Sequence, residues 1–100
     1  MSACGAVVGG VSLENVDLTN QAVIQGVVGQ NNVPASVGYV RLLDKSDEFV
    51  AEVPLSKQGE FRFFAAQGDW TVVTLTPGAT SRTPVSAALG KIVDLEIVVN

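Results

Sequence analysis

From residue 21 onward, the sequence consists of short apolar runs, each separated from the next by turn-forming residues. The runs occupy residues 22–28, 37–43, 48–53, 60–64, 70–75, 82–89 and 92–99. Runs of this length that are bounded by Gly, Pro, Asn and Asp are typical of β-strands. No connecting stretch is long and periodic enough for a crossover helix. The pattern therefore predicts an all-β fold, a seven-stranded antiparallel β-sandwich, and excludes a parallel α/β sheet.

The residue types within the runs support strands. Eighteen of the 100 residues are valine, whose branched side chain packs well on a pleated surface. The last run alternates with a period of two: Val93, Leu95 and Ile97 share one face, and Asp94 and Glu96 share the other. This run is expected to be a strand with one buried face and one solvated face.

Particular residues lead to further expectations within this fold. The strand period places Phe61 and Phe63 in the core and Phe64 on the opposite face, where it is expected to be exposed. Pro54 and Pro84 cannot donate to a β-ladder, so their strands are expected at sheet edges or bulges. Gly59 and Gly68 are expected to supply positive φ in turns, and Gly26 to mark either a bulge or a close approach of the Trp70 ring.

The first twenty residues differ from the rest of the chain. They contain Gly5, Gly9 and Gly10, no lysine or arginine, and no sustained apolar period. Such a segment is expected to be a flexible N-terminal arm. The predicted organisation is therefore a flexible segment over 1–20 followed by one sandwich domain over 21–100.

Composition excludes several classes of function. The chain has no histidine, which removes imidazole bases and imidazole metal ligands, and its single cysteine cannot form an internal disulfide or a zinc site. Six basic residues against ten acidic ones argue against binding to nucleic acid. No apolar run approaches the length of a membrane span, and the N-terminus lacks the pattern of a secretory signal. We therefore expect a cytoplasmic protein that is not an enzyme, with no catalytic residue, cofactor, metal or membrane partner.

Charged side chains were the remaining candidates for a site. Asp44, Asp47, Glu48 and Glu52 gather around one turn, but they lack the spacing of a calcium loop and are expected to form a solvated turn. The side chain of Arg41 is expected to pair with a glutamate on a neighbouring strand.

The arginines also have an alternative interpretation as contact residues. Arg62 and Arg82, like Arg41, are expected on exposed strand faces, with Glu52, Glu60 and Glu96 as their cross-strand partners. A weaker alternative is that Arg41 and Arg62 bind an anion together. Arg41, Arg62 and Phe64 are the predicted surface contacts.

Several motifs resemble a known module. They are Ile24-x-Gly26-x-Val28, Val33-Pro34, Tyr39-Val40-x-Leu42, Gly59-Glu60-Phe61-x-Phe63, Gly68-Asp69-Trp70-Thr71-Val72 and Asp94-Leu95-x-Ile97. Together they resemble a carboxypeptidase-regulatory-like, or transthyretin-like (prealbumin-like), seven-stranded sandwich. Within that group, residues 39–49 and 59–66 are similar to a small actinobacterial family, domain-of-unknown-function family 1416. The resemblance covers residues 21–76 well and the last strand loosely.

The resemblance implies a setting but no mechanism. Members of that family begin with a short cysteine-containing segment and tend to be encoded beside a thiosulfate sulfurtransferase of the rhodanese type. Cys4 is thus the candidate reactive thiol and sulfur acceptor, although the first 40 residues contain no lysine or arginine to lower its pKa. The sequence predicts an accessory binding module in sulfur metabolism with a sulfurtransferase as partner. The alternative is a structural sandwich that forms a homodimer through a strand edge or sheet face.

Overall fold

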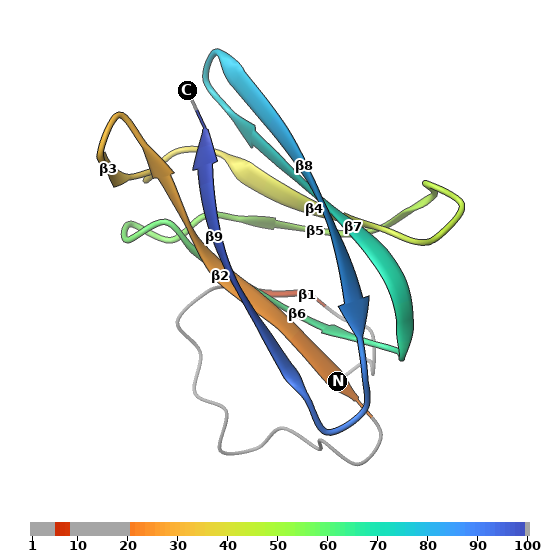
Figure 1. Cartoon of the computed structure of the whole chain (residues 1–100). Helices are drawn as coiled ribbons and strands as arrows, with labels where there is room; N and C mark the ends of the chain where they lie inside the picture. The colour runs from red at the N-terminus through yellow and green to blue at the C-terminus, as the bar shows by residue number, and fades with distance from the viewer. Residues whose placement is uncertain (1–5, 9–20, 100) are drawn as a thin grey trace.

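The computed structural model describes residues 6–8 and 21–99, which form nine β-strands (Figure 1). The strands are β1 Ala6–Val8, β2 Ala22–Gln30, β3 Val33–Pro34, β4 Tyr39–Leu43, β5 Phe49–Pro54, β6 Glu60–Ala65, β7 Gly68–Thr76, β8 Ala79–Ala87 and β9 Ile92–Val99. The described part of the chain has no helix, and therefore none that is long and apolar enough to cross a membrane.

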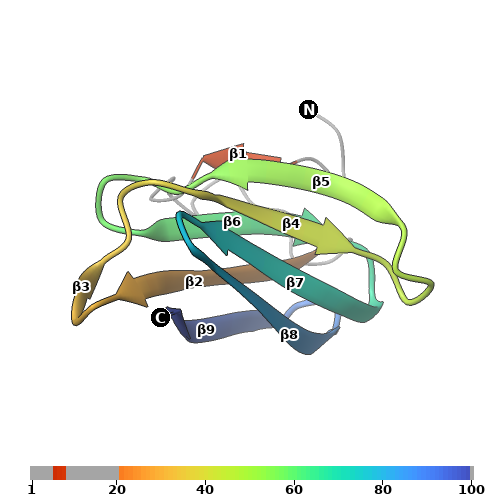
Figure 2. The same cartoon turned by 90° about the horizontal axis from the view of Figure 1, so that it is seen from above.

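The strands form two sheets packed as a sandwich. Sheet A has the order β1-β6-β2-β3, with β9 on the side of β2 that faces away from β6, and sheet B has the order β5-β4-β7-β8. Strands β1 and β5 lie side by side at one margin of the sandwich, and β8 and β9 do so at the other (Figure 2). The predicted all-β sandwich is confirmed, and each of the seven predicted runs overlaps one of its longer strands.

Two features of sheet A differ from the expectation. All strand pairs are antiparallel except that of β2 with β9, which run parallel from Val23↔Ile92 to Gln30↔Val99. Residues 6–8, within the segment expected to be a flexible arm, form β1 and pair with β6. The apolar triplet 6–8 is long enough to add a few main-chain hydrogen bonds to a sheet edge, which explains the difference. The rest of that segment lies outside the described residues.

The core lies between the two sheets and follows the alternation of the strands. Its largest fully buried side chains are Phe61, Phe63, Ile24 and Val28 from sheet A and Leu42, Val40 and Val72 from sheet B. The rings of Phe61 and Phe63 lie 6.0 Å apart between centroids. Burial of each phenylalanine contributes roughly 1.5–3 kcal/mol relative to exposure, so β6 is a principal source of the stability of sheet A.

The prolines lie where their missing N–H groups are tolerated. Pro54 ends β5 and Pro84 lies within β8, and these two strands are the edges of sheet B. The prediction that both prolines mark edge strands is confirmed. Pro84 removes one donor from within β8, and Pro54 ends the row of donors of β5, so both prolines limit how far these edges can pair with another chain.

Glycine is required at three positions for different reasons. Gly59, in the turn before β6, and Gly68, the first residue of β7, adopt the expected positive φ, of 76° and 145°. At Gly26 the constraint is space: an added Cβ would collide with the Leu95 carbonyl oxygen and lie 3.0 Å from a ring carbon of Phe61. The predicted close approach is therefore confirmed, but its partners are Leu95 and Phe61 and not Trp70.

The close approach at Gly26 makes a testable prediction about stability. Gly26→Ala should lower the free energy of unfolding by about 1–3 kcal/mol, because β9 or Phe61 must shift to admit the methyl group. Gly29→Ala, in the same strand, is the matched control, since its nearest neighbour would be the Val33 carbonyl oxygen at an ordinary 3.6 Å. Urea denaturation of both variants checks this. Equal stability of the two would contradict the parallel packing of β9 on β2.

Candidate functional site

The outer face of sheet A gathers polar side chains from three adjacent strands. Because side chains alternate along a strand, the residues between the core-facing ones point to the other side of the sheet. The register of the strands aligns these residues into one face. They are Val23, Gln25 and Val27 of β2, Glu60, Arg62 and Phe64 of β6, and Ile92, Asp94, Glu96 and Val98 of β9. We call this set the outer face of sheet A.

A chain of hydrogen bonds crosses the middle of this face. Arg62 Nε donates to Gln25 Oε1 at 2.9 Å, and Gln25 Nε2 donates to Asp94 Oδ1, also at 2.9 Å. Arg62 Nη1 is buried and has no hydrogen-bond partner. Gln25 therefore links the half-buried guanidinium of Arg62 to the exposed carboxylate of Asp94, which lies 69 positions after Gln25 in the sequence.

The same region forms a shallow groove with an acidic lining. The groove has a volume of about 380 Å³ and is lined by Gln25, Val27, Glu60, Arg62, Asp94 and Glu96 among others. Three carboxylates thus surround one guanidinium that is already engaged with Gln25. Such a lining favours contact with cationic groups and hydrogen-bond donors.

The end of the face nearest β3 is apolar. Val27, Val33 and Val98 are exposed by 43%, 59% and 70%. They line a second groove of about 220 Å³ together with Gly29, Pro34 and Glu96. An apolar section beside a charged section is the arrangement expected of a protein-binding surface.

Phe64 is buried, contrary to the prediction that it is exposed. It lies on the outer face as the strand period required, but only 5% of its surface is exposed. It sits directly across from Val23, which is fully buried, and neither belongs to the core between the sheets. Strand alternation gives the face on which a side chain lies, but it does not reveal whether that part of the face is covered. Phe64 is therefore no surface contact.

The structure separates Arg41 from Arg62. Arg41 lies on β4 of sheet B, where its Nε pairs with Glu52 Oε1 at 2.6 Å across the β4–β5 register, as one of the predicted pairings required. Arg62 lies on β6 of sheet A and binds Gln25, not a glutamate. The two point outward from opposite sheets of the sandwich, so the expectation that they bind one anion together is wrong.

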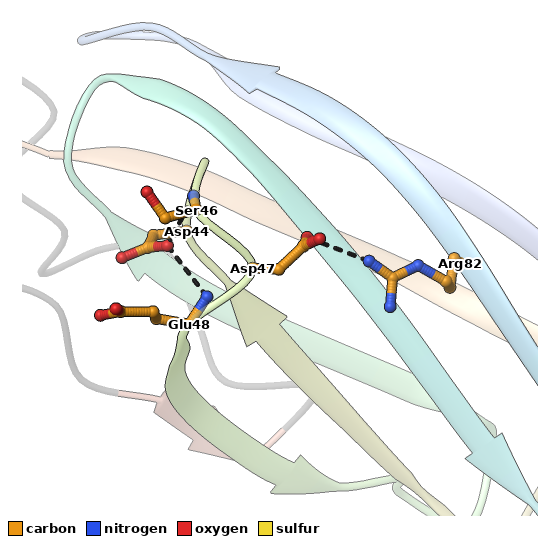
Figure 3. A network of polar contacts seen from close by, with 5 residues as sticks. All are labelled: Asp44, Ser46, Asp47, Glu48 and Arg82. Atoms are coloured by element: carbon orange, nitrogen blue, oxygen red, sulfur yellow. Dashed lines mark hydrogen bonds and ion pairs between the residues drawn. The ribbon is translucent and has the colours of Figure 1, made fainter.

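The carboxylate of Asp44 organises the β4–β5 loop, and that of Asp47 ties the loop to β8 (Figure 3). Asp44 Oδ1 accepts hydrogen bonds from the main-chain N–H groups of Ser46 and Glu48, at 2.8 and 3.0 Å. Asp47 Oδ1 pairs with Arg82 Nη2 at 3.0 Å, a partner that the sequence did not indicate. Within residues 6–8 and 21–99, no three acidic or cysteine side chains come together to hold a metal ion. The loop is thus an exposed turn, as the sequence predicted.

The remaining predicted site residue, Cys4, lies outside the described residues. Sequence reasoning did not identify Gln25 or the grouping of Asp94 with Arg62. The alternation of residues 93–99 did place Asp94 and Glu96 on a solvated face. The neighbour of that face could not be read from one strand, because it depends on the parallel pairing of β9 with β2.

The fold and this face define a small two-sheet β-sandwich with a mixed acidic and apolar outer surface. The family model described as "Protein of unknown function (DUF1416)" matches residues 4–99. The chain belongs to this family, as the motifs in its sequence indicated.

Relatives from mycobacteria agree with this assignment. An uncharacterized protein of Mycolicibacterium smegmatis is 49% identical over 72 residues, which cover 71% of this chain and 80% of the relative. Two uncharacterized proteins of Mycobacterium tuberculosis are each 52% identical over 63 residues, which cover 62% of this chain and 63% of theirs. The match thus leaves more than a third of each M. tuberculosis protein uncovered.

Two solved structures share the fold. One is the dioxygenase domain of a dioxygenase carbohydrate-binding protein fusion from Streptomyces sp. SirexAA-E, with a TM-score of 0.62, 12% identity, and coverage of 88% of this chain and 83% of that chain. The other is a DUF3823 family protein from Parabacteroides merdae, with a TM-score of 0.57, 9% identity, and coverage of 82% and 47%. At such identities the likeness concerns the sandwich alone, and the narrower transthyretin-like assignment stays a prediction.

The hydrogen-bond chain on the outer face makes a second prediction. Gln25→Ala should destabilise the protein by about 1–3 kcal/mol, because it leaves the half-buried Arg62 without its partner. The double variant Gln25→Ala/Arg62→Met should lose less free energy of unfolding than the sum of the losses of the two single variants. Arg82→Ala is the control, since it removes an exposed ion pair worth at most about 1 kcal/mol. Chemical denaturation tests the set, and strict additivity would contradict the coupling.

Proposed function

We propose that this protein is a non-enzymatic binding and accessory module that works in the cytoplasm beside a thiosulfate sulfurtransferase of the rhodanese type. The observation that carries the proposal is the outer face of sheet A, with an acidic groove beside exposed valines. Such a surface suits a protein partner better than a small substrate, because it is shallow and mixes charged with apolar contacts. The family resemblance supplies the class of partner.

Cys4 is the proposed sulfur acceptor. In the sequence it stands two positions before Ala6, where β1 begins, and β1 pairs with β6 beside Arg62 through Val7. The acceptor role requires the Cys4 thiol to reach the active site of a partner that docks on sheet A.

The proposed transfer is a thiol–persulfide exchange. The enzyme's cysteine thiolate attacks the sulfane sulfur of thiosulfate, the S–S bond of thiosulfate breaks, sulfite leaves, and the cysteine then carries a persulfide. The Cys4 thiolate attacks the outer sulfur of that persulfide, a new S–S bond forms at Cys4, and the bond between the two sulfurs of the enzyme breaks. The enzyme's cysteine leaves as a thiolate and the outer proton stays on the transferred sulfur, so the step needs no oxidant.

Mass spectrometry tests the acceptor role. After incubation with thiosulfate and the sulfurtransferase, the intact protein should gain about 32 Da, the mass of one sulfur atom. Cys4→Ser removes the only cysteine and should abolish the gain. A small thiol acceptor in a parallel reaction shows that the enzyme is loaded. A loaded enzyme that leaves reduced Cys4 unchanged would overturn the acceptor role.

Self-association through the sheet face is a second candidate function. The exposed Val27, Val33 and Val98 favour it, because burial against a second copy would remove three valines from water. Light scattering should then give a dimer mass that falls to the monomer mass in Val98→Lys. A wild-type protein that is monomeric at high concentration would exclude this candidate.

A further inference from the structure

The four margins of the two sheets differ in how open they are to another strand. Strand β1 has three residues, β5 has an irregular register with β4 near Leu43 and ends in Pro54, and β8 contains Pro84. Strand β9 has eight residues and contains no proline, lysine or arginine. Proteins protect edges by shortness, proline, bulges and charged side chains, lysine above all. Among the described strands, β9 is the long edge without proline, bulge or lysine, and its charged side chains are the acidic Asp94 and Glu96.

The main chain of β9 presents free donors and acceptors on one side. The Lys91 carbonyl oxygen accepts a hydrogen bond from Val23 N–H at 3.2 Å, so this carbonyl points toward β2. Because the direction alternates along a strand, Val93, Leu95 and Ile97 also point toward β2. The N–H and C=O groups of the alternate residues, from Ile92 to Val98, therefore point away, where no described strand pairs with them.

The side chains of β9 add a specific pattern to this edge. On the outer face, Asp94 and Glu96 are exposed and lie between the exposed Ile92 and Val98. On the inner face, Val93 and Leu95 pack against the core but stay partly exposed. One more strand beside β9 would cover these two inner side chains and complete the sheet.

A second copy of the chain fits this edge poorly. Two β9 strands related by a two-fold axis pair antiparallel, and their opposing residues share a face. If the axis passes through residue 94, 95 or 96, carboxylates face carboxylates: Asp94 with itself, Asp94 with Glu96, or Glu96 with itself. Like charges directly opposite destabilise a sheet. The edge therefore disfavours a β9–β9 dimer and favours a strand of opposite charge.

We propose that the free edge of β9 binds an extended basic segment of a partner protein as an added strand. The segment carries Lys or Arg at two alternate positions, opposite Asp94 and Glu96, and apolar residues at the next alternate positions, opposite Ile92 and Val98. Its intervening side chains cover Val93 and Leu95. The inference rests on the proposed function in making the partner a protein, and it does not depend on sulfur transfer to Cys4.

A synthetic peptide of sequence Val-Thr-Lys-Val-Lys-Thr-Val, with blocked ends, tests the proposal. It is titrated into the full ¹⁵N-labelled chain and followed by NMR. We expect the largest shifts at the amides of Ile92, Asp94, Glu96 and Val98, and binding roughly tenfold tighter than that of the peptide with Glu in place of both Lys. Shifts elsewhere, equal affinity of the two peptides, or no binding of either would overturn the proposal.

Backbone methylation tests whether the peptide pairs as a strand. One analogue is N-methylated at the two lysines and the other at the intervening residues. An antiparallel strand points its lysine N–H groups at β9 and a parallel strand points the intervening ones, so one analogue should lose binding and the other should keep it. Retention of binding by both would show that no strand is added and would overturn the proposal.

Protein variants distinguish binding at the β9 edge from a general charge effect and from sulfur transfer to Cys4. Glu96→Lys should abolish the preference for the lysine peptide, whereas Glu48→Lys, an equal charge change in the exposed β4–β5 loop, should preserve it. Preference that survives Glu96→Lys would contradict the proposed pairing. Cys4→Ser should bind the peptide as the wild type does. The outcome of the peptide experiment is therefore independent of the outcome of the sulfur-transfer experiment.

Discussion

The parallel pairing of β2 with β9 is the contact on which the rest of the structure depends. It joins the first long strand to the last one over eight residue pairs and allows the Leu95 main chain to lie against Gly26. Without it, sheet A would end at β2 and the core around Phe61 would open on one side. The same pairing brings Asp94 to Gln25 and so creates the hydrogen-bond chain of the outer face.

The two proposed binding surfaces follow from this arrangement. The outer face of sheet A is acidic where β9 meets β2 and apolar where β9 meets the region of β3. As the last strand added, β9 also leaves the main-chain groups of its other side without a paired strand among the described ones. Face and edge share Asp94, Glu96 and Val98, so a partner that adds a strand to β9 also contacts the outer face.

Local patterns in the sequence predicted the strands, the core role of Phe61 and Phe63, the edge positions of both prolines and one cross-strand ion pair of Arg41. These depend on strand period and on main-chain donors, which short stretches reveal. The parallel partner of β9, the burial of Phe64 beside Val23 and the pairing of Asp47 with Arg82 depend on which distant segments become neighbours. A single sequence contains no direct record of such neighbours, and the candidate site was therefore only partly predictable.

Strand β9 is an edge that is open on one side and bonded to β2 on the other. Hydrogen exchange of the free protein, measured amide by amide, tests this most directly. The amides of Val93, Leu95 and Ile97 should exchange slowly because they bond to β2, and those of Asp94, Glu96 and Val98 should exchange much faster. Uniformly slow exchange along β9 would contradict the account, because it would mean that the outer side of the strand is already covered.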